Sequence, residues 1–189
     1  MLASDALFGN KVMKKTLQGT YAPVPAEHFA GVSVALYFAK LRHPKCARIF
    51  PSLKQFYLTT NASNERPSVE IVYVSLDEDR ETFERARSMM PWCSVEYDSD
   101  VRRNLINRYQ VTDEEMSWGT TRKLPSFKLP QLIVIGPHGQ QAGRLDLDQP
   151  EETFIHHWDY RHNKWPGEAR PRSATAARGW ENQVALGPR

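Results

Sequence analysis

The sequence predicts an α/β fold, and three observations support that prediction. Two nearly continuous apolar segments, residues 34–38 and 69–76, are typical of central strands that are buried on both faces of a sheet. Segments of helical character follow both of them, so strands and helices alternate along the chain. Hydrophobic residues make up 40% of the 189 residues, which is sufficient for one compact core. A chain of this length is expected to form one main domain.

The first half of the chain is expected to contain two strands and a helix. Residues 11–17 form an edge strand, and residues 34–38 form a buried strand. A helix over residues 44–58 begins with Pro44, which suits the first turn because its missing N–H needs no partner there. Pro51 lies inside this helix and should kink it.

The second half continues the alternation. Residues 69–76 form a central parallel strand, and residues 77–89 form an amphipathic helix with acidic residues at its start, as the helix dipole favours. The other expected elements are a strand over residues 94–97, a helix over residues 99–109, a hairpin of residues 131–135 and 140–145, and a closing helix over residues 151–160.

A redox motif that lacks its first cysteine lies between the first buried strand and the helix after it. A Cys-x-x-Cys pair at this place is a thiol–disulfide site, because the N-terminus of a helix stabilises a thiolate. Here the four positions are His43, Pro44, Lys45 and Cys46. The substitution at the first position decides what chemistry the site can perform.

Four segments of the chain resemble the tryparedoxin and nucleoredoxin branch of the thioredoxin superfamily. They are Leu36-Tyr37-Phe38 with Pro44 and Cys46, residues 70–79, Met90-Pro91-Trp92, and residues 129–139. The resemblance spans roughly residues 5–148 in consistent order. It implies a thioredoxin-like fold, in which helices flank a central mixed sheet and the Leu129–Pro130 bond is cis. It also implies that Arg42 and His43 stand where the family has Trp and the nucleophilic Cys.

The resemblance further implies a site without its attacking group. In a thioredoxin-type reaction the first cysteine attacks the substrate disulfide as a thiolate, and the second resolves the mixed disulfide. The imidazole of His43 forms no stable bond to sulfur in this cycle. Cys46 is then either a residual monothiol that His43 activates or a small buried residue of the helix. The second interpretation is favoured, because the second motif position lies one turn inside the helix.

Cys93 is interpreted as a core residue at the start of a strand. A disulfide to Cys46 would need Cα atoms within about 7 Å and an oxidising compartment. No metal site or cofactor is predicted, since Cys46 and His43 would supply only two ligands. Four other histidines follow no ligand spacing either: His138, His156, His157 and His162. The acidic residues 77–79 are explained by the start of a helix.

Two segments depart from the family pattern around a domain of residues 1–160. Residues 112–127 form an insertion before the cis-proline strand, and a loop of this length usually has a function. Residues 161–189 form a basic C-terminal extension that has too few aliphatic residues to build its own core. Its Trp and Arg residues are expected to contact a partner: Trp165, Trp180, Arg170 and Arg172.

Three functions are compatible with these features. The favoured one is a redox-inactive subunit of a larger protein assembly, which contacts other subunits through the insertion and the extension. The alternatives are a monothiol oxidoreductase that uses Cys46 and a module that binds an extended peptide beside Pro130. No apolar run approaches 18 residues, so no membrane span is expected. The net charge of +3 does not favour nucleic acid as a partner. An intracellular location is expected, cytoplasmic by default, with mitochondrial and ciliary assemblies as alternatives.

Overall fold

The computed structural model describes residues 3–63, 66–112, 127–147, 149 and 153–167. The strands of its main sheet are β1 (Val12–Lys15), β2 (Tyr21–Pro23), β3 (Ser33–Ala39), β4 (Val69–Ser75), β5 (Cys93–Val95), β8 (Gln131–Ile135) and β9 (Gln141–Leu145). The helices are α1 (Ala3–Phe8), α2 (Pro44–Asn61), α3 (Arg80–Ser88) and α4 (Asp100–Tyr109), with short 3₁₀ helices η1 (Ala26–Phe29) and η3 (Phe154–His157). Two short strands, β6 (Val111–Thr112) and β7 (Phe127–Lys128), pair in parallel beside the main sheet.

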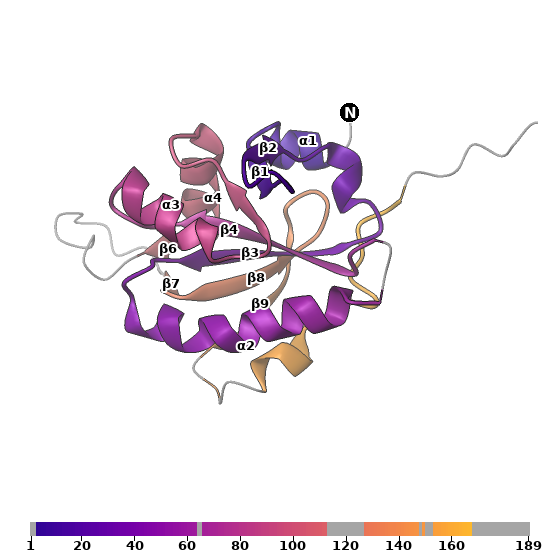
Figure 1. Cartoon of the computed structure of the whole chain (residues 1–189). Coiled ribbons are helices and arrows are strands. Elements are labelled where there is room, and N and C mark those ends of the chain that lie inside the picture. Colours follow the sequence, from indigo (N-terminus) through magenta and orange to yellow (C-terminus); the bar gives the residue numbers. More distant parts are fainter. Residues whose placement is uncertain (1–2, 64–65, 113–126, 148, 150–152, 168–189) are drawn as a thin grey trace, which may run out of the picture.

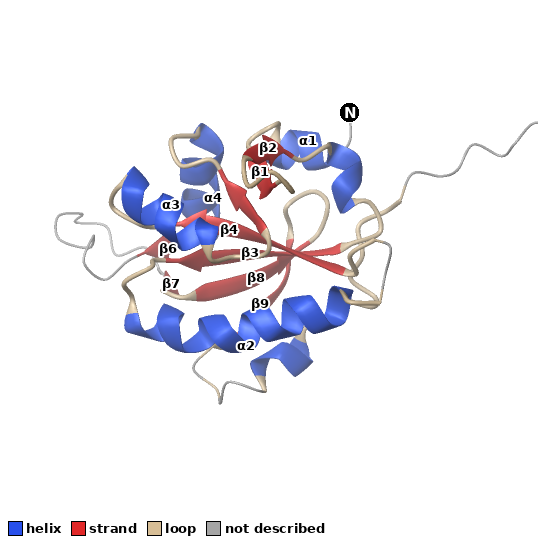
Figure 2. Ribbon diagram, in the orientation of Figure 1, coloured by secondary structure: helices blue, strands red, loops and turns tan. Residues whose placement is uncertain are grey.

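The described residues form three layers around one mixed sheet with strand order β2-β1-β5-β4-β3-β8-β9. Helix α2 covers one face of the sheet, and helices α3 and α4 cover the other face (Figures 1 and 2). Strand β3 pairs in parallel with β4 and antiparallel with β8, so it lies at the centre. This arrangement confirms the predicted thioredoxin-like α/β fold.

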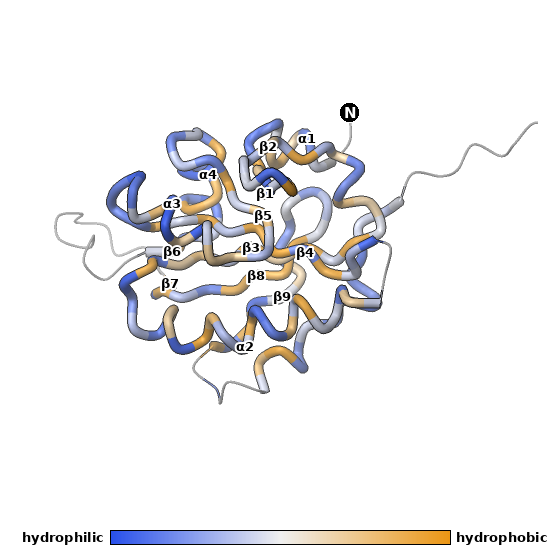
Figure 3. The backbone as a smooth tube through the Cα atoms, in the orientation of Figure 1, coloured by the Kyte–Doolittle hydropathy of each residue, from blue (hydrophilic) through white to orange (hydrophobic). Residues whose placement is uncertain are grey.

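Strands β3 and β4 are buried along their whole length, as their continuous apolar sequences predict. Their register places Leu36 opposite Val72 and Phe38 opposite Val74. Apolar residues concentrate along these central strands (Figure 3). The paired strands therefore form a rigid platform, and the loop after β3 leaves it at a fixed place.

Helix α2 positions the redox motif. It begins after His43, which is its N-cap, and Pro44 occupies its first turn as predicted. Its buried residues recur every three or four positions and face the sheet: Cys46, Ile49, Leu53 and Tyr57. Helical periodicity therefore places Cys46 on the inner face and the preceding residues at the exposed helix start.

Two predicted elements differ from the observed ones. The strand predicted at the edge, β1, lies between β2 and β5, because the short strand Tyr21–Pro23 pairs with its outer side. The closing helix predicted over residues 151–160 is a single 3₁₀ turn, Phe154–His157, in the described part of that segment. After this turn the backbone of Trp158 is extended. Its side chain is buried, and its indole N–H donates a hydrogen bond of 2.9 Å to Ser33 Oγ.

Trp165 belongs to the domain core, which corrects its assignment to a partner interface. Its side chain is 4% exposed and packs on the rings of Phe8 and Phe29. Its indole N–H donates to the carbonyl of Ile135 at 3.0 Å, and its main chain bonds to Gly31 and Val32. The core therefore extends beyond the boundary expected at residue 160. The physical reason is that an isolated Trp can complete a core without any apolar periodicity around it.

The remaining parts of the two departing segments lie outside the described residues. These are residues 113–126 of the insertion and residues 168–189 of the extension, with Trp180, Arg170 and Arg172. Among the helices of the described residues, none combines the length and apolar character that crossing a membrane requires.

Candidate functional site

The imidazole of His43 stands where the motif would present its attacking thiol. His43 has extended backbone angles, φ −76° and ψ 123°, and its carbonyl accepts the N–H of Ala47 at 3.1 Å, as an N-cap residue does. Its side chain makes no capping hydrogen bond. Its Nδ1 atom is buried and has no hydrogen-bond partner among the described residues. The helix N-terminus therefore carries a half-buried imidazole in place of a thiolate.

Cys46 is hidden beneath this loop. Its side chain is 4% exposed and lines an apolar cavity of about 180 Å³ between α2 and the sheet. Other residues of the cavity wall include Tyr37, Leu41, Phe50, Tyr73 and Met90. The two cysteines of the chain both lie in the described part, and no disulfide joins them. Burial of Cys93, which was expected in the core, is complete.

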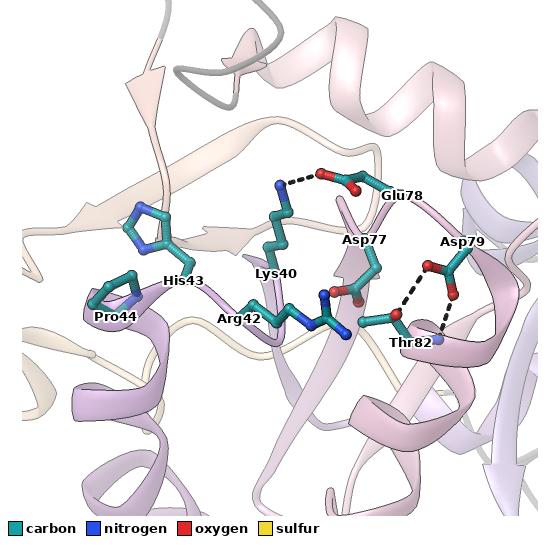
Figure 4. A pocket seen from close by; sticks show the side chains of 8 residues that line it. All are labelled: Lys40, Arg42, His43, Pro44, Asp77, Glu78, Asp79 and Thr82. Atoms are coloured by element: carbon teal, nitrogen blue, oxygen red, sulfur yellow. Dashed lines mark hydrogen bonds and ion pairs between the residues drawn. The ribbon is translucent and has the colours of Figure 1, made fainter.

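A polar pocket of about 280 Å³ lies on the other side of the motif loop (Figure 4). Lys40 Nζ donates to Glu78 Oε1 at 2.8 Å across its mouth. Asp79 caps helix α3, because its carboxylate accepts from the N–H of Thr82 at 2.7 Å and from the Thr82 hydroxyl at 3.0 Å. These hydrogen bonds hold the pKa of Asp79 below its usual value. Asp79 thus has the helix-start role that its sequence position predicts.

Asp77 has a different role, which the sequence interpretation missed. Its buried carboxylate accepts hydrogen bonds from the hydroxyls of Tyr73 at 2.5 Å and Ser75 at 2.6 Å. It also accepts the main-chain N–H of Leu41 at 2.7 Å. Burial, together with the charge of Asp77, raises the pKa of Tyr73 well above its usual value. Asp77 therefore anchors the loop that carries the motif to the end of β4.

Pro130 lines a third hollow, of about 460 Å³, on the motif side of the sheet. The Leu129–Pro130 bond is cis, as predicted. Arg144 lies over the ring of Phe127, 3.6 Å from its centroid, and donates to Gln131 Oε1 at 2.7 Å. Lys45 of the motif also lines this hollow, so the motif and the cis-proline border one recess.

Comparison with known proteins places the chain in a family. A family model described as thioredoxin-like matches residues 31–141, which is more than half of the chain. The sheet order, the motif at the start of α2 and the cis-proline agree with that match, and the chain belongs to the thioredoxin-like family. The curated proteins to which the chain is similar include nucleoredoxins.

The curated relatives are longer proteins. Probable nucleoredoxin 2 from Oryza sativa subsp. japonica is 27% identical over 131 residues, which cover 69% of this chain and 29% of that protein. Nucleoredoxin-like protein 1 from Xenopus laevis is 34% identical over 122 residues, which cover 61% of this chain and 50% of that protein. The chain therefore spans half or less of the length of these two relatives.

Two solved structures show the same fold. The thioredoxin from Wuchereria bancrofti has a TM-score of 0.54 and 29% identity, with 73% of this chain and 83% of that chain covered. The tryparedoxin from Trypanosoma brucei has a TM-score of 0.55 and 21% identity, with 76% of this chain and 87% of that chain covered. At 21% identity the second likeness concerns the fold alone.

The structure brings the predicted motif residues and Pro130 to one end of the sheet. His43 and Pro44 line the polar pocket, Cys46 lines the apolar cavity, and Lys45 meets Pro130 at the third hollow. Trp165 does not join them. Sequence reasoning missed four residues that shape this end of the sheet: Lys40, Asp77, Phe127 and Arg144. Their contacts come from distant segments, and no local pattern marks them.

Proposed function

We propose that this protein does not catalyse dithiol–disulfide exchange and serves as a structural or accessory subunit of a larger protein assembly. One observation carries the proposal: His43 occupies the helix N-cap, while Cys46 is 4% exposed behind it. Exchange requires a thiolate that can reach the substrate sulfur. Neither group meets that requirement, because one is an imidazole and the other is enclosed.

The same end of the molecule offers a surface for a protein partner. Met89 beside the apolar cavity and Phe127 beside the cis-proline are 44% and 41% exposed. Two basic side chains, Lys45 and Arg144, line the same hollow as Phe127. An apolar centre with a charged rim is typical of protein interfaces. We therefore infer that this thioredoxin-like domain, which lacks the nucleophilic cysteine, serves to bind a protein partner.

The first test measures disulfide reduction. In an insulin-type assay with dithiothreitol, we expect the protein to give no rate above the reagent alone, and we expect the variant His43→Cys to gain activity. The new thiol would lie at the helix N-terminus, where its pKa falls. The double variant His43→Cys/Cys46→Ser is the matched control, because it keeps the attacking thiol and lacks the resolving one. Turnover by the unmodified protein at the rate of a thioredoxin would contradict the proposal.

The second test concerns the assembly. In a lysate of its source cells, the full chain should elute in size-exclusion chromatography well ahead of a 21.7 kDa monomer. The double variant Met89→Ser/Phe127→Ser should move to the monomer position. Leu17→Ser is the control, because Leu17 is fully exposed at the β1–β2 turn. Monomeric elution of the unmodified chain would rule out a stable assembly.

The monothiol alternative can be separated by alkylation. If Cys46 acts as a thiol, iodoacetamide should label it in the folded protein at a rate near that of a free cysteine. We expect labelling only after unfolding, because the Cys46 side chain is 4% exposed and the cavity beside it is apolar. Mass spectrometry of the native and denatured samples distinguishes the two.

A further inference from the structure

A second cluster of polar side chains lies away from the motif, inside the domain. At its centre is Glu70, near the start of β4, whose side chain is completely buried. Its carboxylate accepts from Lys14 Nζ at 2.8 Å and from the Tyr57 hydroxyl at 3.0 Å. His28 Nε2 lies 2.5 Å from Glu70 Oε2, and Cys93 Sγ lies 3.9 Å from the same nitrogen.

The cluster combines a buried carboxylate with side chains that are partly open to solvent. Glu70 is completely buried, whereas Lys14 is 31% and His28 18% exposed. The ammonium group that faces Glu70 therefore comes from a side chain that can turn towards solvent.

Three different donor atoms lie close together here, and one of them is an oxygen of this carboxylate. The sulfur of Cys93, a ring nitrogen of His28 and an oxygen of Glu70 all lie within 4.8 Å of one another. In a tetrahedral zinc site with bonds of about 2.0–2.3 Å, two donor atoms lie about 3.3–3.6 Å apart. The Cys93–His28 distance is close to that value, and the His28–Glu70 pair needs to open by less than about 1 Å.

We propose that His28, Glu70 and Cys93 bind one divalent metal ion of the zinc class. Binding replaces the thiol proton, which passes to solvent, with a sulfur–metal bond, and no group changes its oxidation state. His28 coordinates through Nε2 as a neutral imidazole, so the ring proton that faces Glu70 in the metal-free protein resides on Nδ1 instead. Lys14 releases Glu70 and turns towards solvent, and a water molecule completes four-coordination.

The donor set selects the class of metal. Calcium and magnesium require oxygen ligands, whereas one thiolate, one imidazole and one carboxylate are the ligand types of zinc. In the metal-free protein Lys14 already neutralises Glu70, so the carboxylate needs no further partner there. The Cys93 thiol gains a role as a ligand when a metal ion replaces the ammonium group of Lys14.

The bound metal would connect three parts of the chain that are far apart in sequence. His28 comes from η1, Glu70 from β4 and Cys93 from β5. Such a bond holds the N-terminal segment to the central sheet, and a metal that binds only the folded state stabilises it. The inference does not rest on the function proposed for the motif end of the molecule.

Cobalt(II) is the probe for the first experiment, because a thiolate ligand gives it a near-ultraviolet charge-transfer band. The full chain, reduced and freed of metal with EDTA, is titrated with Co²⁺. We expect one equivalent to produce this band with the visible bands of a tetrahedral site, and Zn²⁺ to remove them. No charge-transfer band at saturating Co²⁺ would overturn the proposal.

The two cysteines provide matched variants. Cys93→Ser should lose the charge-transfer band, and Cys46→Ser should keep it. His28→Gln should weaken Co²⁺ binding by at least about tenfold. A band that depends on Cys46 would overturn the proposal. X-ray absorption of the zinc-loaded unmodified protein does not depend on the folding of any variant: it should show one sulfur at about 2.3 Å with nitrogen and oxygen at about 2.0–2.2 Å. A zinc shell without sulfur would equally reject the assignment.

Lys14→Met tests the competition between the ammonium group and the metal. Without Lys14 the buried Glu70 loses its cation, so the metal-free protein should melt at a lower temperature, and zinc should restore the loss. Co²⁺ affinity should rise by about tenfold, because no ammonium group has to be displaced. Lys15→Met is the control, since Lys15 lies on the same strand and is exposed. Unchanged affinity in Lys14→Met would contradict binding at Glu70.

Discussion

Trp165 shows how one side chain can fix where a domain ends. It lies in a cluster of rings with Phe8 and Phe29, at the end of the sheet where β3 begins. Its indole N–H donates a hydrogen bond to the carbonyl of Ile135. The segment around it has no apolar periodicity, so its contribution to the core comes from this single residue.

Replacing Trp165 should therefore have a large effect on stability. We expect Trp165→Ala to lower the free energy of unfolding by about 3–5 kcal/mol, because it leaves a cavity and removes the hydrogen bond to the Ile135 carbonyl. Trp165→Phe keeps a ring and should cost less. Leu17→Ala, at a fully exposed position, should change stability by less than about 0.5 kcal/mol. Urea unfolding followed by circular dichroism measures all three, and a small loss for Trp165→Ala would place this residue outside the core.

At the scale of elements, the two helices on the face opposite α2 start in chemically different ways. Asp79 caps α3 with a carboxylate, and Ser99 caps α4 with a hydroxyl that accepts from the N–H of Arg102 at 3.3 Å. The first cap depends on ionisation, and the second does not. Because the pKa of Asp79 is lowered in the folded protein, its cap stabilises the fold above the unfolded pKa and is lost as pH falls through the folded one.

The two caps should consequently respond differently to pH. Asp79→Ala should lower the unfolding midpoint at pH 7, and the difference from the unmodified protein should shrink as pH falls below about 4, where the carboxyl group of the unfolded chain takes up a proton first. Ser99→Ala should cost about 1 kcal/mol at both pH values. Denaturant midpoints at pH 7 and pH 3 test this. An Asp79→Ala difference that is as large at pH 3 as at pH 7 would show that ionisation is not involved.

The sequence predicted elements better than it predicted contacts between them. The helix expected over residues 44–58 is confirmed as α2, because a proline in the first turn of a helix is a local signal. Asp77 looked like one more acidic residue at a helix start, since its partners become visible only when the loop after β3 folds back to it. The cis bond before Pro130 was predicted from the resemblance to a known family, because no periodicity in the sequence could indicate it.

The same limit applies to the buried cluster. His28, Glu70 and Cys93 are separated by dozens of residues, and their spacing matches no ligand motif. They meet because η1 packs beside β4 and β5, so no local sequence spacing indicates the cluster.

At the scale of the whole molecule, the melting temperature of a truncated chain should depend on where it ends. An end at Gly167 keeps Trp165, whereas an earlier end removes it. Deleting residues 168–189 should leave the melting temperature within about 2 °C of the full chain, because the core contacts of Trp165 remain. Deleting residues 165–189 should lower it by about 6–20 °C, as loss of a buried Trp implies. Differential scanning calorimetry of the two truncated proteins checks this. If the extension binds a partner, the shorter deletion should also release that partner from the folded domain.

The main-chain contacts of Trp165 and the motif loop lie at opposite ends of β3. Its main chain pairs with Gly31 and Val32, just before β3 begins, whereas the motif loop follows β3 at its far end (Figure 1). The seven residues of β3 separate these two ends by about 20 Å. One ligand at the motif and another at the exposed Gly31 would thus be held apart by a paired strand. Two partners bound in this way would each raise the local concentration of the other without touching it.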